Sequence, residues 1–157
     1  MHAVAEPFPP PAELVPQGGA MSLLSRVISH DAHGTSCAVD PAASALLRAA
    51  DGSLPAWVAL EYMAQCIAAH GGLLARERGA PPRIGFFVGS RRASFHVPTL
   101  PLREELRVRA EPLRAGGGLL TFGCTLERAS DGERLAEGQL SVFIPDDLAS
   151  LPLGGLP

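Results

Sequence analysis

LPAWVALEYMAQCIAAHGG, residues 54–72, is the segment that decides the fold of this chain. Almost every position in it is apolar or small, yet Glu61 lies in the middle and Gln65 follows one helical turn later. The pattern predicts one long helix over residues 57–78, because Gly79 and the prolines just beyond it are stop signals. A helix that is apolar on nearly all sides has to be covered on most of them. We therefore expect the rest of the chain, or a second subunit, to enclose this helix.

Strand-like segments lie on both sides of the predicted helix. They are residues 21–40, interpreted as two short strands around a turn, and residues 83–97, 105–113, 119–127 and 134–144. Leu106, Val108 and Ala110 alternate with charged residues, which is typical of a half-buried strand. The Asp131–Gly132 pair favours a tight hairpin turn. This order of elements predicts an α+β fold, in which a curved antiparallel β-sheet wraps around one long central helix.

Length and composition bound the domain organisation and the function. The 157 residues suit one domain, and 46% hydrophobic residues are enough to fill a core. We predict an irregular leader over residues 1–13, a single domain over 14–146 and a flexible tail over 147–157. The net charge of −3 and the 5% of aromatic residues provide no drive toward nucleic acid or an anionic membrane.

The cysteines and the polar residues of the helix exclude further classes. Cys37, Cys66 and Cys124 form no CxxC motif, so the sequence indicates no metal site, no redox pair and no cofactor. Reduced thiols are typical of a cytoplasmic protein, and the N-terminus lacks the features of a signal peptide. The predicted helix contains Glu61 and His70, and such polar residues argue against a membrane span.

The polar residues of the helix fall on different faces. At about 100° per residue, Gln65 lies about 40° from Glu61, whereas His70 points about 180° away. A carboxylate in an apolar helix has to be paired, hydrogen-bonded or protonated, and it is a candidate general acid or base. A glutamate held by backbone donors, or one at a subunit interface, explains the pattern equally well. The free N–H groups at the start of the helix could polarise a carbonyl group.

The segment around Glu61 resembles the central-helix motif of the hotdog-fold β-hydroxyacyl-ACP dehydratases, roughly P-G-V-x-x-x-E-x-x-A-Q. Pro55, Ala56, Glu61, Ala64 and Gln65 are at matching spacing. The strand after the helix (83–95) and the closing strand (135–145) resemble those of a dehydratase-like subgroup from aryl-polyene-type gene clusters, and residues 15–31 align with the opening motif. The resemblance extends over about residues 14–145.

This resemblance implies a hotdog dimer whose two sheets join edge to edge. It implies a β-hydroxyacyl thioester substrate, carried by acyl carrier protein or coenzyme A, in fatty-acid or polyene biosynthesis. Glu61 matches the family carboxylate that protonates or positions the leaving hydroxyl group, and Gln65 matches the glutamine that supports it. Ala56 matches the glycine whose N–H binds the thioester carbonyl. Trp57, beside it, would belong to the same substrate-binding site.

Position 17 departs from the family pattern. A histidine is expected after the proline that Pro16 matches, and Gln17 stands in its place. A glutamine can bind a substrate through hydrogen bonds, but it cannot act as a general base near neutral pH. We therefore predict a Glu-bearing subunit that is weakly active as a homodimer or is completed by a related hotdog subunit carrying the histidine. A hotdog thioesterase using Glu61 alone, and a non-catalytic acyl-binding or scaffold subunit, are the alternatives.

The remaining polar groups suggest weaker sites. His30 and His33 lie in a predicted turn, where they make a poor metal site because no other ligand cluster converges on them. His96 is expected on the surface or at a subunit interface. Arg91 and Arg92 could meet the phosphate of a pantetheine arm or an acidic carrier protein. A solvated strand face is the simpler interpretation of these two arginines.

Overall fold

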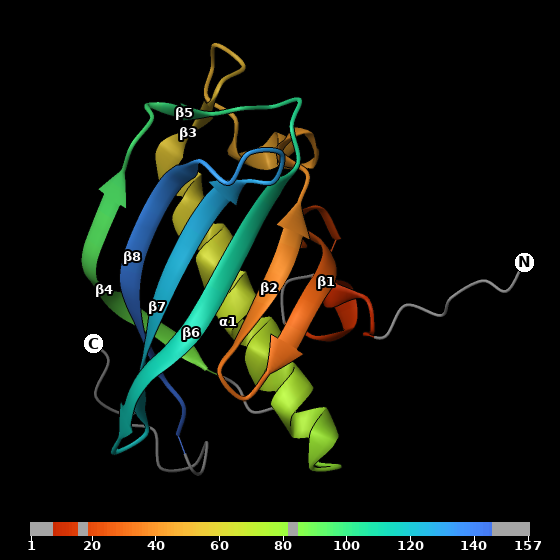
Figure 1. Ribbon diagram of the computed structural model, residues 1–157, viewed down its shortest axis with the longest axis vertical. Coiled ribbons are helices and arrows are strands. Elements are labelled where there is room, and N and C mark those ends of the chain that lie inside the picture. The colour runs from red at the N-terminus through yellow and green to blue at the C-terminus, as the bar shows by residue number, and fades with distance from the viewer. Residues whose placement is uncertain (1–7, 16–18, 82–84, 146–157) are drawn as a thin grey trace, which may run out of the picture.

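The computed structural model describes residues 8–15, 19–81 and 85–145, and it confirms the predicted α+β architecture. Six antiparallel strands form a curved sheet in the order β1-β2-β6-β7-β8-β4 (Figure 1). These strands are β1 (Leu24–Asp31), β2 (Gly34–Val39), β6 (Leu106–Gly116), β7 (Leu119–Arg128), β8 (Arg134–Phe143) and β4 (Phe86–Phe95). Gln17 and the predicted tail lie outside the described residues.

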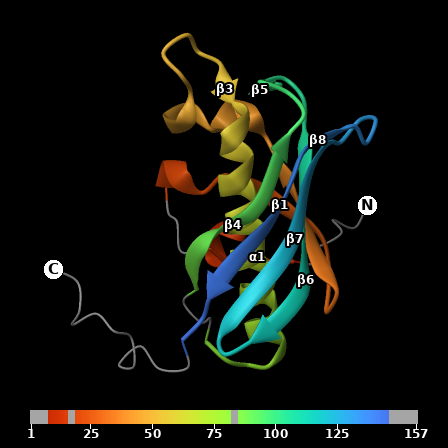
Figure 2. The ribbon, with the colours of Figure 1, turned by 90° about the vertical axis from the view of Figure 1, so that its left-hand side faces the viewer.

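The long helix α1 (Ala59–Glu77) lies along one face of the sheet and packs against β1, β2, β6, β7 and β8 (Figure 2). The alternation predicted for β6 is confirmed, because Val108 and Ala110 are fully buried under the helix. They pair across the sheet with Leu126 and Cys124 of β7, which are buried too. Burial of each larger apolar side chain contributes about 1.5–3 kcal/mol, so the contacts in this helix–sheet layer stabilise the fold.

Both ends of α1 are set by local backbone chemistry. The helix begins two residues later than predicted, because Ala56–Val58 first form a tighter 3-10 turn, η5, directly after Pro55. At the other end Gly79 has a φ of +64°, and the N–H of Ala80 donates to the carbonyl of Ala75 over 2.9 Å. This is the hydrogen-bond pattern of a Schellman ending, and it confirms Gly79 as the stop signal.

Short elements complete the fold around the start of the helix. They are a two-stranded ladder of β3 (Leu54–Pro55) and β5 (Thr99–Leu100), and the 3-10 turns η1 (Pro11–Glu13), η2 (Gly19–Met21), η3 (Pro41–Ala43) and η4 (Ala45–Leu47). The β3–β5 ladder holds the start of the helix against the segment that follows β4. Within the described residues, no helix combines the length and the hydropathy that crossing a membrane requires.

Residues 8–15, which precede β1 in the chain, cover one flank of α1. Leu14 is buried against Gly72, where an added Cβ would lie 3.0 Å from the Leu14 carbonyl oxygen. Glycine at position 72 is therefore what allows the two backbones to approach so closely. Glu13 also pairs with Arg76 of the helix, over 2.9 Å. Part of the predicted leader thus packs onto the domain.

A buried polar chain connects the other side of α1 to β1 and β2. The Thr35 hydroxyl lies 2.8 Å from Nδ1 of His70 and 2.7 Å from Nδ1 of His30, whose Nε2 lies 3.1 Å from Glu77. One hydroxyl can donate to only one of the two rings, so it accepts from the other. Burial, and then the neighbouring His30, lower the pKa of His70 to about 4. His70 therefore remains neutral and structural at ordinary pH.

We predict that stability falls as the pH drops below about 6.5, because of His70. An unfolded histidine binds a proton near pH 6.5, whereas folded His70 does so only near pH 4. The unfolded chain therefore binds more protons between these values, which favours unfolding there. From neutral pH to about pH 5, urea titrations should show a loss of about 2 kcal/mol in the free energy of unfolding.

His70→Asn should flatten this pH dependence, because the amide can bond to Thr35 without titrating. His33→Asn, in the exposed β1–β2 turn, serves as the control and should keep the wild-type profile. An unchanged slope in the His70 variant would show that other groups dominate. Those that face His70 are His30, Asp31, Glu77 and Arg109.

Candidate functional site

Glu61 and Gln65 lie on one face of α1, as the helical spacing predicted. The Gln65 side-chain NH₂ donates to the Glu61 carboxylate over 3.0 Å and to the Met21 carbonyl over 2.7 Å. The Gln65 side-chain oxygen accepts the N–H of Leu23 over 2.9 Å. Gln65 is fully buried, whereas Glu61 is partly exposed. The side-chain amide of Gln65 therefore does two things: it orients the Glu61 carboxylate, and it holds the segment that leads into β1.

The face of α1 that carries Glu61 is the face that the described residues leave partly open. Trp57 and Gly71 are exposed, and Glu61, Ala64 and Ala68 between them are only partly buried. Apart from the carboxylate, the residues on this stripe are apolar or small. A surface of this kind is available to a substrate or to another subunit.

The donors at the start of the helix differ from the expectation in one respect. The N–H of Ala56, expected to bind a thioester carbonyl, donates to the carbonyl of Pro98 over 3.2 Å. The next N–H, that of Trp57, has no hydrogen-bond partner among the described residues. The Trp57 side chain is 54% exposed at the same end of the helix. A carbonyl group placed there would meet the Trp57 N–H without displacing an existing bond.

None of the other candidates from the sequence is hydrogen-bonded to Glu61 among the described residues. His30 and His70 are bonded to Thr35 between the helix and the sheet, and His96 is exposed beyond the end of β4. Cys66 is fully buried. The pKa of its thiol is raised, mainly by a hydrogen bond with Cys37 and next by burial, so it is a poor nucleophile. No cluster of metal ligands occurs in the part of the chain that the structure describes.

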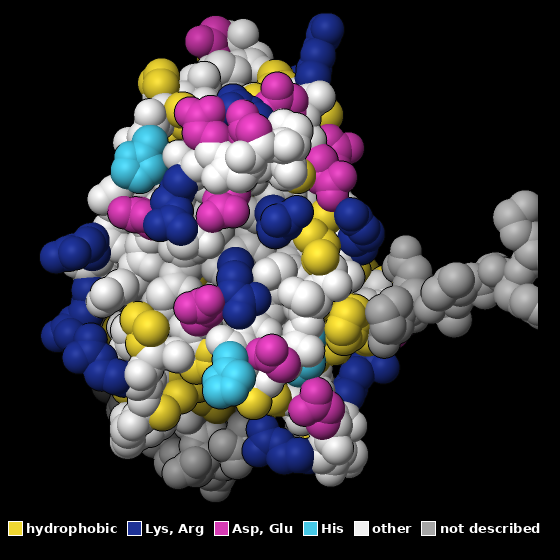
Figure 3. All heavy atoms as spheres, in the orientation of Figure 1, with side chains coloured by type: hydrophobic (Ala, Val, Ile, Leu, Met, Phe, Trp, Pro, Cys, Tyr) yellow, Lys and Arg dark blue, Asp and Glu magenta, His cyan; other side chains and the backbone are white. Residues whose placement is uncertain are grey.

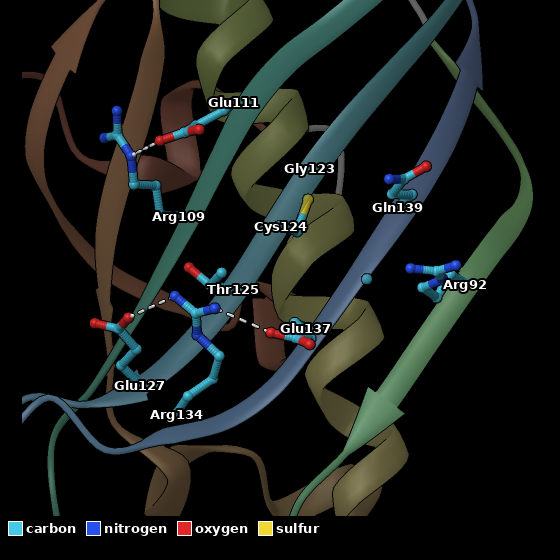
Figure 4. Close-up of a pocket in the computed structure, with 11 residues that line it drawn as sticks. Arg92, Arg109, Glu111, Gly123, Cys124, Thr125, Glu127, Arg134, Glu137 and Gln139 are labelled. Carbon is cyan, nitrogen blue, oxygen red and sulfur yellow. Dashed lines mark hydrogen bonds and ion pairs between the residues drawn. The ribbon is translucent and has the colours of Figure 1, made fainter.

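The convex face of the sheet, opposite α1, carries a hollow of about 460 Å³ that the sequence did not predict (Figure 4). Gly123, which has no side chain, is one of the residues that line it. Two of its three arginines are paired with carboxylates, Arg109 with Glu111 over 2.7 Å and Arg134 with Glu137 over 3.0 Å, and Glu127 balances the third, Arg92, in net charge. Because these charges cancel locally, this hollow provides no strong attraction for a charged ligand.

Comparison with known proteins places this geometry in a family. The sequence profile of the ApeP-like family, described as ApeP dehydratase, matches residues 9–152. A sequence search of curated proteins found no match. The solved dehydratase heterocomplex ApeI:P from Xenorhabdus doucetiae is similar, with a TM-score of 0.85 and 24% identity, over 95% of this chain and 99% of that chain.

Thioesterases share the fold at lower similarity. Zebrafish thioesterase superfamily member 2 has a TM-score of 0.63 and 17% identity, over 86% of this chain and 93% of that chain. A hypothetical thioesterase from Streptococcus pneumoniae, solved with coenzyme A, has a TM-score of 0.57 and 13% identity, over 76% of this chain and 84% of that chain.

A long helix held against a curved antiparallel sheet, shared with these structures, is the hotdog fold, which confirms the predicted class. Within that class, the match over residues 9–152 shows that the chain belongs to the ApeP-like dehydratase family. The family resemblance drawn from the Glu61 segment is therefore confirmed. The roles of the individual site residues remain predictions.

We predict that Gln65 is needed for stability as well as for orienting Glu61. Gln65→Leu removes three hydrogen bonds and leaves the buried N–H of Leu23 without its acceptor, which costs about 1–3 kcal/mol for that group alone. Glu61→Gln loses no buried partner and should cost less than about 1 kcal/mol. Chemical unfolding of both variants measures the difference. Equal losses would show that the bonds from Gln65 to Met21 and Leu23 carry little stability.

Proposed function

We propose that this chain is the Glu-bearing subunit of a dehydratase that acts on a carrier-bound β-hydroxyacyl thioester, in cytoplasmic fatty-acid or polyene biosynthesis. The observation that carries the proposal is the Glu61 carboxylate, oriented by Gln65 on an open helix face. No histidine contacts it among the described residues. The site therefore has an acid but no partner base in the described part of this chain.

The proposed reaction divides the two proton transfers between two subunits. A base on the partner subunit removes the α-proton of the thioester, and the Trp57 N–H stabilises the negative charge that develops on the carbonyl oxygen. The C=C bond forms as the β C–O bond breaks, and protonated Glu61 donates its proton to the departing hydroxyl group. Water and the enoyl thioester are the products. The proton held by the partner's base then returns to Glu61 for the next cycle.

The structure offers an edge at which a partner could pair. β4 is the last strand of the sheet, and its outer edge has no neighbouring strand among the described residues. It exposes Phe86, Phe87 and Val88 at 42%, 51% and 62% of their surfaces. An unpaired edge with apolar side chains favours the addition of another strand. We propose that a related hotdog subunit pairs here and extends the sheet.

The partner proposal predicts that a charge on β4 prevents assembly. Val88→Asp places a carboxylate on the proposed interface, so co-expressed subunits should separate during size-exclusion chromatography with light scattering. Ile28→Asp, on β1 at the opposite edge and 36% exposed, is the matched control and should leave the assembly intact. If the β1 variant dissociates the complex and the β4 variant does not, the partner pairs at β1.

The catalytic proposal predicts that Glu61→Gln abolishes dehydration by the assembled complex. Loss of a positioned acid should lower kcat by about 10²–10⁴-fold, measured by mass spectrometry as loss of water from a β-hydroxyacyl thioester. Glu77→Gln changes a carboxylate near the far end of the same helix and should retain activity. This chain alone should be weakly active or inactive. Robust activity of the lone chain that survives Glu61→Gln would overturn the proposal.

A thioesterase is the second candidate, because one carboxylate oxygen of Glu61 has no hydrogen-bond partner in the described residues and could orient water. Release of free thiol from an acyl thioester by this chain alone, abolished by Glu61→Gln, would select this function. Binding of the acyl carrier without turnover in any subunit combination would instead indicate a non-catalytic subunit.

A further inference from the structure

The convex face of the sheet carries a second hollow, of about 310 Å³, close to the β6–β7 turn. Its walls are Arg91 of β4 and Arg114 of β6, and Thr121 and Ser141 line it from the central strands. Leu119 provides an apolar side. In the view of Figure 3, arginine side chains gather along the edge that β4 occupies in Figure 1, whereas the middle of this face mixes both signs of charge.

Two irregularities in the strands create this arrangement. Strict alternation would place Arg91 and Arg92 on opposite faces of β4. The pairing of β4 with β8 shifts between Ser90 and Arg92, so Arg91 is an extra residue, and both arginines line hollows on the convex face. The pairing of β6 with β7 shifts in the same way between Pro112 and Arg114. Such bulges re-aim side chains, and here they bring two guanidinium groups to one hollow.

Among the described residues no acidic side chain balances the charge of the second hollow, unlike that of the hollow over Gly123. Within the described residues no carboxylate lines it, and neither Arg91 nor Arg114 forms an ion pair. An arginine guanidinium binds phosphate and carboxylate oxygens through paired N–H donors. Two such groups around one hollow therefore attract an oxyanion.

The hydroxyl groups between the arginines supply further donors. Thr121 and Ser141 pair across β7 and β8 and are only 7% and 8% exposed. Their hydroxyl oxygens are 3.4 Å apart, longer than the usual distance of about 2.8 Å for this kind of bond. Only one of the two protons can lie between them, so the other is free to donate to a third group.

We propose that Arg91, Arg114, Thr121 and Ser141 form a binding site for the phosphate group of an organic phosphate ester. The two guanidinium groups and the spare hydroxyl proton would bind the phosphate oxygens. The volume exceeds that of a lone phosphate ion, and Leu119 provides apolar surface for the group that carries it. The site lies on the face of the sheet opposite α1, so it does not depend on the function proposed for Glu61.

The test is phosphate binding by the full chain, alone or with its partner subunit, at constant ionic strength. Inorganic phosphate, 4′-phosphopantetheine and pantetheine are titrated by calorimetry, and amide chemical shifts of residues 91, 114, 121 and 141 are followed by NMR. Pantetheine should not bind at this site, because it lacks the phosphate. Tighter binding of phosphopantetheine than of inorganic phosphate supports the ester, and equal binding would identify free phosphate as the ligand instead.

The Arg91→Ser/Arg114→Ser double variant should weaken binding by at least about 10-fold. Thr121→Val, which removes a hydroxyl group and no charge, should weaken phosphate binding by about 3-fold. Arg134→Ser removes a charge of the same sign whose guanidinium is already paired, and it should change the affinity by less than about 2-fold. Thermal unfolding without ligand checks that each variant is folded. The proposal would be overturned if chloride produced the same heats and chemical-shift changes as phosphate. It would also be overturned if the double variant bound phosphate with the wild-type affinity.

Discussion

A helix with apolar residues on most of its sides persists in water only where other parts of the protein cover it. In this chain five strands cover the inner face of α1, and residues 8–15 cover one flank through the contact of Leu14 with Gly72. Where the structure describes the chain, the least covered part of α1 is the stripe from Trp57 to Gly71, with Glu61 near its beginning. Within the described part of the chain, the requirement for burial therefore also defines the face of the helix that is open to an external molecule.

Two buried polar groups give the two sides of α1 different roles. Thr35 links the helix to β1 and β2 through histidines that are enclosed and cannot reach a substrate. Gln65 links the helix to residues 21–23 and presents Glu61 at the open stripe. One network stabilises the layer of helix and sheet, and the other holds a carboxylate at the surface. This division supports a site that is shared with another subunit, as the function proposed for the ApeP-like chain requires.

Much of the fold and part of the site follow from local patterns. Three signals are local, because each depends only on residues that are neighbours in the sequence. They are the apolar helix segment, the alternation of Leu106, Val108 and Ala110, and the stop at Gly79. The pairing of Glu61 with Gln65 follows from helical spacing alone. The acceptor of the Ala56 N–H could not be predicted, because Pro98 is far away in the chain and reaches the helix only through the β3–β5 ladder.

The proposed phosphate site likewise depends on contacts between distant strands, which the sequence could not predict. The sequence by itself determined that the chain forms a central helix in an antiparallel sheet, that Glu61 shares a face with Gln65, and that Arg91 and Arg92 follow each other in a strand. Only the tertiary structure decided that both arginines reach the convex face and that Arg114 joins Arg91 there. The reason is physical: periodicity is a property of consecutive residues, whereas bulges and strand register depend on how distant strands pair.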